Sequence, residues 1–205
     1  MSYNFRELPS IETERLILRR MTMDDAQDLF DFTSNPIGKE YLSWDAHKTI
    51  EQTYGFLAMM EGRRVNNEPV QWGIELKSEK RIIGIIGLAI YMPAHNRGEF
   101  TYILSPDYLG KGYMTEAAAA FFRFCFEEIK LNRLEGKNEE DHIDTHKIIE
   151  KLGMRREGVL RDLLFQKGKY RNYIMWSILA KEYYEKRENE TNSPEKYYKV
   201  VINPA

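Results

Sequence analysis

Residues 99–118 constrain the fold most, because they combine a strand, a glycine turn and the start of a helix. Residues 100–104 are aromatic and β-branched, which favours a strand, and Pro106 ends it because proline has no N–H for a sheet ladder. Gly110 and Gly112 allow a tight turn. Apolar residues then recur at helical spacing, which predicts a helix from about Tyr113. They are Met114, Ala117, Ala118, Phe121, Phe122, Cys125 and Ile129.

This turn has the composition of a phosphate cradle. A helix start gathers unpaired N–H groups and a positive dipole end, and Lys111 and Thr115 add a charge and a hydroxyl. A Walker loop is absent, and a dinucleotide loop would need a glycine at position 115, although Glu135 lies about twenty residues further on. The alternative is a tight strand-to-helix connection that binds nothing.

Residues 108–117, Tyr-Leu-Gly-Lys-Gly-Tyr-Met-Thr-Glu-Ala, resemble the acyl-CoA pyrophosphate loop of the GNAT N-acetyltransferases. The likeness is greatest to the branch that holds the bacterial ribosomal-protein N-terminal acetyltransferases. Further segments resemble that branch in the same order along the chain: residues 13–19, 24–26, 81–88, 150–158 and 167–171. The resemblance implies an enzyme that uses acetyl-CoA to acetylate a primary amine by direct attack in a ternary complex.

The fold class predicted from the pattern is α/β, with one mixed sheet of about seven strands and about four helices. An antiparallel meander is expected first, then a parallel step at the centre of the sheet, as the resemblance also implies. The last two strands form a hairpin across residues 167–168. The strands are expected at residues 16–18, 71–76, 81–91, 100–104, 133–136, 159–165 and 170–180, and the helices at about 22–33, 49–63, 113–129 and 143–152.

Residues 1–183 are predicted to form a single domain, followed by a charged C-terminal tail at residues 184–205. Residues 197–202 resemble a short isolated strand. They are either a frayed end or a strand added to another subunit.

The composition argues against several classes of protein. The net charge of −2 gives no basic surface for nucleic acid, and no apolar run approaches the length of a membrane span. Cys125 is the only cysteine, so no internal disulfide forms and the reducing cytoplasm fits best. We expect a cytoplasmic monomer or homodimer.

The resemblance assigns two catalytic roles. Glu99 matches the acidic position that serves as general base, often through a water, and its alternative is a solvated charge at a strand end. Thr145 matches a serine that hydrogen-bonds the departing thiolate, and it shares a helix face with Ile148 and Ile149. His142 stands where the family typically has asparagine. This departure puts the local CoA contacts and full catalytic competence in question.

The residues expected to bind acetyl-CoA come from three segments. The strand supplies backbone groups, the glycine loop holds the pyrophosphate, and the later helix adds two side chains. They are Ile103, Leu104 and Ser105; Gly110, Lys111, Gly112, Tyr113, Met114 and Thr115; and His142 and Thr145. Tyr102 itself is predicted to pack in the core.

No metal site is expected. His142 and His146 are four residues apart, but Ile143 replaces the glutamate that a zincin helix needs, and no cysteine cluster assists. His95 is a candidate second base or a surface imidazole.

The acceptor pocket is predicted between the loop joining the first two helices and the closing hairpin. Aromatic side chains would line it, unless they belong to the core. They are Tyr41, Trp44, Tyr91, Phe165 and Tyr170. The acceptor itself, a protein N-terminus or a small-molecule amine, is left open. Two other functions stay open: a CoA-binding protein without transferase activity, and a nucleotide-binding oxidoreductase.

Overall fold

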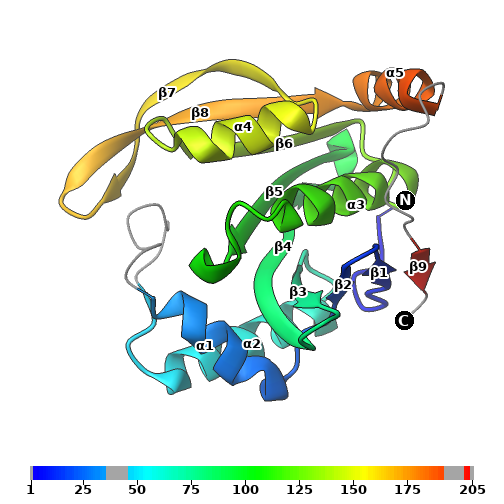
Figure 1. The fold of residues 1–205 in the computed structure, drawn as a ribbon. Coiled ribbons are helices and arrows are strands. Elements are labelled where there is room, and N and C mark those ends of the chain that lie inside the picture. Colours follow the sequence, from blue (N-terminus) through cyan, green and yellow to red (C-terminus); the bar gives the residue numbers. More distant parts are fainter. Residues whose placement is uncertain (1, 36–45, 192–200, 204–205) are drawn as a thin grey trace.

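A computed structural model describes residues 2–35, 46–191 and 201–203. In this part of the chain one mixed sheet of nine strands carries helices on both faces (Figure 1). The strands are β1 (Ser10–Glu12), β2 (Leu16–Arg19), β3 (Gln71–Leu76), β4 (Arg81–Met92), β5 (Arg97–Leu104), β6 (Arg133–Glu139), β7 (Arg155–Gln166), β8 (Lys169–Leu179) and β9 (Val201–Asn203). The α-helices are α1 (Ala26–Thr33), α2 (Ile50–Val65), α3 (Tyr113–Glu127), α4 (Ile143–Lys151) and α5 (Ala180–Thr191). None of these helices is long and apolar enough to cross a membrane.

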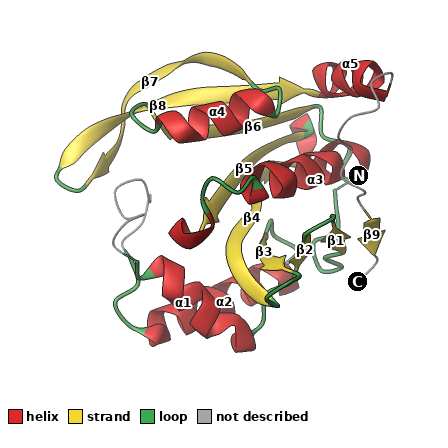
Figure 2. Ribbon diagram, in the orientation of Figure 1, coloured by secondary structure: helices red, strands yellow, loops and turns green. Residues whose placement is uncertain are grey.

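The strand order is β7-β8-β6-β5-β4-β3-β2-β1-β9 (Figure 2). Neighbouring strands are antiparallel everywhere except between β5 and β6, which α3 connects and which run parallel. The antiparallel meander with a parallel central step is therefore confirmed. The hairpin turn at residues 167–168 is confirmed too, because both residues have the positive φ that a tight hairpin needs, 50° at Lys167 and 82° at Gly168.

The parallel pair β5–β6 is short, and this decides where the sheet opens. Only three residue pairs are in register, and the last of them is Glu99 with Glu135. Beyond it β5 continues to Leu104 against β4, while β6 continues to Glu139 against β8. The two strands therefore part in the middle of the sheet.

The main core lies between α3 and the sheet. The Trp72 ring packs edge-on against Phe121 and Phe124, with ring centroids 5.6 and 5.3 Å apart. Cys125 is fully buried on the same helix, and burial raises the pKa of its thiol, so it is a core residue as predicted. A smaller cluster around Leu29, Leu57 and Ile85 packs α1 and α2 on the opposite face of the sheet.

The sequence prediction missed β1 and α5, and it expected the C-terminal strand at residues 197–202, which overlap β9. β1 and β9 have three residues each, too few for an alternating pattern, and they pair with one another at the edge of the sheet. Residues 201–203 thus add a strand to their own chain, where Asn203 donates to the Glu12 carboxylate at 3.0 Å. α5 was missed because it is densely charged, yet Tyr183 stacks on Phe126 at 4.6 Å and docks the helix.

Candidate active site

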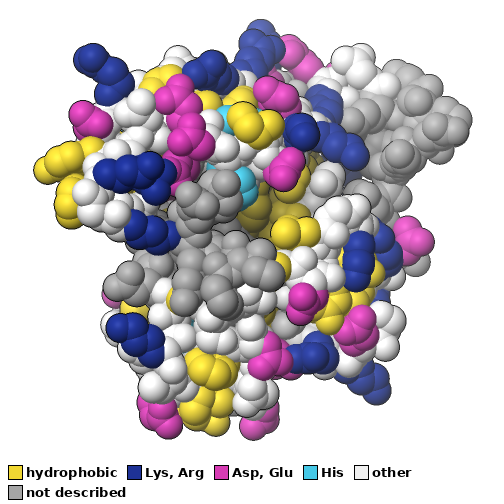
Figure 3. Space-filling model, turned by 60° about the vertical axis from the view of Figure 1, so that its left-hand side comes forward, with side chains coloured by type: hydrophobic (Ala, Val, Ile, Leu, Met, Phe, Trp, Pro, Cys, Tyr) yellow, Lys and Arg dark blue, Asp and Glu magenta, His cyan; other side chains and the backbone are white. Residues whose placement is uncertain are grey.

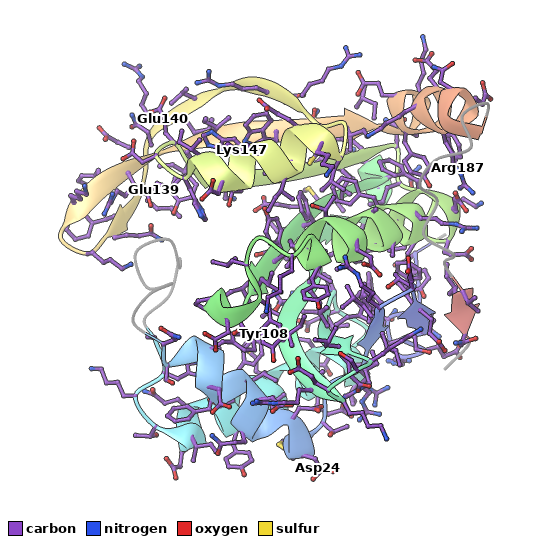
Figure 4. The ribbon with its side chains drawn as sticks, in the orientation of Figure 1. Asp24, Tyr108, Glu139, Glu140, Lys147 and Arg187 are labelled. Atoms are coloured by element: carbon purple, nitrogen blue, oxygen red, sulfur yellow. The ribbon has the colours of Figure 1, made fainter. Side chains whose placement is uncertain are left out.

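A cavity of about 920 Å³ occupies the place where β5 and β6 separate. The residues before and at the start of α3 bound one side of it, and α4 bounds the other. Histidine and hydrophobic atoms are visible near the centre of the face in Figure 3, with charged side chains around them. Figure 4 shows Lys147 on α4, with Glu139 and Glu140 near the start of that helix and Tyr108 across from them.

The glycine loop presents backbone to this cavity. Gly110 and Gly112 have φ of 73° and 80°, a left-handed conformation that favours glycine. The Glu116 N–H donates to the Gly112 carbonyl, so the three N–H groups before it have no partner within the helix. Five of the six loop residues predicted to bind acetyl-CoA line the cavity. They are Gly110, Gly112, Tyr113, Met114 and Thr115.

A buried carboxylate in α3 fixes the loop. Glu116 is fully buried and accepts hydrogen bonds from the Thr13 hydroxyl at 2.6 Å and the Arg15 Nε at 2.7 Å. The same guanidinium donates to the Lys111 carbonyl at 3.1 Å and lies 4.5 Å from the Tyr113 ring. The turn between β1 and β2 therefore holds both ends of the loop, a connection that the sequence analysis missed.

Two predicted cofactor-binding residues do not line the cavity. The Lys111 Nζ donates to the Asp107 carbonyl at 3.0 Å and lies over the Tyr108 ring. Ser105 is buried, and its N–H donates to the Ile83 carbonyl of β4 at 2.8 Å. Because strand backbone groups alternate in direction, this bond turns the N–H groups of Tyr102 and Leu104 away from β4, toward the opening.

Glu99 lies at the end of the parallel pairing between β5 and β6, and its carboxylate forms an ion pair with Lys137. Its carboxylate is 2.8 Å from the Lys137 Nζ on β6, and 13% of its side chain is exposed. Lys137 lines the cavity, whereas Glu99 does not. Strand alternation puts Glu99 and Thr101 on one face of β5, and Phe100 and Tyr102 on the other, which faces α3.

Thr145 and His142 meet at the start of α4. The Thr145 Oγ1 lies 2.9 Å from the His142 Nδ1, and both residues line the cavity. Thr145 is buried, as its helix position predicts. Burial lowers the pKa of His142, so the imidazole is neutral at pH 7. His146 packs on Trp176 at 5.5 Å.

Several cavity residues were absent from the sequence prediction. Phe32 reaches the cavity from α1, and Asn138 lies on β6, where its Oδ1 accepts from the Trp176 indole at 2.7 Å. Lys147 and Lys151 also line it from α4. Their spacing of four residues, which places them on one helix face, was a signal that could have found them.

Three of the five predicted acceptor-binding aromatics, Tyr91, Phe165 and Tyr170, do not line this cavity. Phe165 and Tyr170 pack on each other near the tip of the β7–β8 hairpin, 63% and 64% exposed. The Tyr91 hydroxyl instead accepts from the Tyr3 N–H at 3.2 Å. These residues lie elsewhere because strand pairing and the N-terminal segment determine their neighbours. Tyr41 and Trp44 lie outside the described residues.

Comparisons with known proteins agree with this geometry. The chain belongs to the GNAT acetyltransferases, because the model of that domain matches residues 15–155. An uncharacterised N-acetyltransferase of Bacillus licheniformis is 28% identical over 176 residues, 86% of this chain and 99% of that one. The spermidine N(1)-acetyltransferase of Escherichia coli K12 is 34% identical over 110 residues, 54% of this chain and 58% of that one. A GNAT-family acetyltransferase structure from Bacillus anthracis has a TM-score of 0.75 at 26% identity, covering 84% of this chain and 99% of that one.

The chain is therefore an acetyltransferase, and its cofactor is acetyl-CoA. The residues present fit this cofactor. A Cβ at Gly110 would meet open space, α3 begins with N–H groups that have no partner within the helix, and β5 turns backbone donors into the opening. The expected family and mixed α/β fold are thus confirmed. The family match gives no support to the oxidoreductase alternative.

Proposed function

We propose that this protein transfers an acetyl group from acetyl-CoA to a primary amine by direct attack. The observation that carries the proposal is the separation of β5 from β6 beyond Glu99 and Glu135, which forms the cavity. In this proposal the phosphate-binding backbone and Lys137, which pairs with Glu99, lie at two parts of one site. Bound acetyl-CoA would supply the activated thioester.

The chain's own groups would bind and orient the cofactor. The N–H groups at the start of α3, with the Lys111 charge nearby, suit a pyrophosphate. Backbone groups of Tyr102 and Leu104 suit the amides of an extended arm, because β5 has no strand paired with it there on the β6 side. Lys147 and Lys151 would add positive charge on the α4 side.

Glu99 is the proposed general base. It lies where β5 and β6 part, on the face of β5 opposite Phe100 and Tyr102. Because Lys137 contacts its carboxylate, a water would relay the proton from an amine in the cavity. Thr145 is the proposed donor to the departing thiolate, because its hydroxyl lies at the cavity wall at the start of α4.

The acceptor is proposed to be a protein N-terminus or a small-molecule amine, with polyamines included. The partial likeness to a spermidine acetyltransferase supports the polyamine class. The resemblance of the glycine loop to ribosomal-protein acetyltransferases supports the peptide class. We also propose that the protein works in the cytoplasm, because its single cysteine is buried and unpaired.

Calorimetric titration with acetyl-CoA, with NADH as the control, tests the proposal first. Binding of acetyl-CoA alone leads to an amine screen that begins with N-terminal peptides and polyamines. Acetylation of any amine supports the proposal. Binding without acetylation in that screen would favour the alternative of a CoA-binding protein without transferase activity, and no binding would overturn the proposal.

A further inference from the structure

The hydroxyl of Tyr102 is buried without a hydrogen-bond partner among the described residues. Buried polar groups are nearly always paired, since leaving one unpaired costs free energy. Five buried side-chain atoms of the described residues lack a partner, and among them only that of Tyr102 belongs to a residue that lines the cavity. It therefore calls for a role beyond the core packing that the sequence analysis assigned to Tyr102.

Aromatic packing holds the Tyr102 ring, and its hydroxyl interacts with a residue of α4. The ring stacks on Phe100 with centroids 5.7 Å apart, and Phe122 packs edge-on against Phe100 at 5.0 Å. The hydroxyl interacts with that of Thr145, although the two fall short of a full hydrogen bond. Burial raises the pKa of Tyr102 to about 12, so its O–H remains a donor at neutral pH.

The Thr145 oxygen thus has two polar neighbours, His142 and Tyr102. A threonine hydroxyl can accept two hydrogen bonds and donate one. The His142 Nδ1 is 2.9 Å from the Thr145 Oγ1, and the Tyr102 hydroxyl also interacts with Thr145. If both neighbours donate, the acceptor capacity of the oxygen is used, and its proton has no acceptor except one inside the cavity.

We propose that Tyr102 and His142 are positioning residues that turn the Thr145 proton toward the sulfur of bound CoA. The inference rests on the proposed function, because it requires CoA in this cavity. It requires the His142 tautomer that carries a proton on Nδ1. It also explains how histidine serves where the family typically has asparagine, since both side chains offer an N–H.

The transfer step balances with these roles. The amine nitrogen forms a bond to the acetyl carbon and loses a proton toward Glu99. The carbon–sulfur bond breaks, and its electron pair stays on sulfur. The Thr145 O–H donates a hydrogen bond to that thiolate, which takes a proton from solvent when CoA leaves. Tyr102 and His142 lose no proton during the step.

The test is a pH titration of CoA bound to the full-length protein, followed by the ultraviolet absorbance of the thiolate. This readout needs no acceptor amine. Thr145→Val should raise the pKa of the bound thiol by about one to two, a tenfold to hundredfold loss of thiolate. Tyr102→Phe and His142→Leu should raise it in the same direction, and His142→Asn should restore the wild-type titration.

A double variant separates positioning from general packing. Tyr102→Phe should add nothing to the effect of Thr145→Val, because it acts through the same hydroxyl. Tyr184→Phe is the control, since the Tyr184 hydroxyl on α5 donates to the Phe126 carbonyl of α3. A wild-type titration in Tyr102→Phe, or additive effects in the double variant, would overturn the inference and leave the proposed function standing. A wild-type protein that binds no CoA would overturn both.

Discussion

The Nε of Arg15 donates to the Glu116 carboxylate at 2.7 Å and joins the turn between β1 and β2 to the first turn of α3. The Arg15 side chain is 39% exposed, whereas that of Glu116 is fully buried. The carboxylate therefore depends on its protein partners, because water cannot replace them.

The first prediction concerns this carboxylate. Glu116→Gln should lower the free energy of unfolding by about 1–3 kcal/mol, toward the lower value because Arg15 is partly solvated. Urea unfolding measures the change. Glu185→Gln is the matched control, because its pair with Lys181 is exposed and should contribute almost nothing. Equal effects of the two substitutions would contradict this account.

Gly136 on β6 tests the packing beneath the cavity. A Cβ at this position would overlap the Phe100 ring, on which Tyr102 stacks. Gly136→Ala should therefore cost about 1–3 kcal/mol of unfolding free energy through overpacking. Gly158→Ala is the control, because a Cβ there meets nothing within 4 Å. Chemical denaturation of both variants measures the free energy of unfolding. An unchanged value for Gly136→Ala would contradict the prediction, because the Phe100 ring would then move aside without cost.

Glu99→Gln should reduce turnover about 10²–10⁴-fold at neutral pH, the range typical of a lost general base. Affinity for acetyl-CoA should hardly change, because Glu99 does not line the cavity. Steady-state kinetics with an acceptor from the amine screen, together with calorimetry, measure both quantities. Glu75→Gln, which breaks a pair with Arg19 elsewhere in the sheet, is the control. Wild-type turnover at every pH would remove Glu99 from the role.

The buried imidazole of His142 should make the stability of the protein depend on pH. Burial lowers its pKa in the folded protein below the value near 6.5 in the unfolded chain. In acid the unfolded state therefore binds more protons than the folded state. The contribution of His142 to the free energy of unfolding is complete above about pH 6.5 and is lost as the pH falls through the folded pKa. The stability difference between wild type and His142→Asn should shrink over that window. Thermal melts from pH 7.5 to 5 test it, and parallel curves would contradict it.

Lys147 and Lys151 should make part of the affinity for acetyl-CoA depend on salt. Replacing both by glutamine should weaken acetyl-CoA binding by about 0.2–1 kcal/mol per lysine, because exposed charges act weakly. The loss should diminish at high ionic strength, where charges are screened. Calorimetry in low and high salt measures this. Lys181→Gln, on α5, is the control, and a loss that is independent of salt would refute an electrostatic role.

Local pattern was enough to predict much of the fold. Aromatic and β-branched residues followed by two glycines and a helical apolar stripe predicted β5, the loop and α3 together. These signals work because backbone conformation depends on neighbouring residues. β1 and its pairing with β9 escaped prediction, because this pairing depends on two distant ends of the chain meeting.

The same distinction between local sequence and tertiary contacts applies to the candidate site. By itself, the sequence determined the glycine loop, the inward face of Thr145 and the membership of a family through motifs in order. The tertiary structure alone decided that Lys137 holds Glu99, that Arg15 braces the loop, and that the Tyr102 hydroxyl meets Thr145. These contacts join residues far apart in the chain, and only the packing of separate strands and helices brings such side chains together.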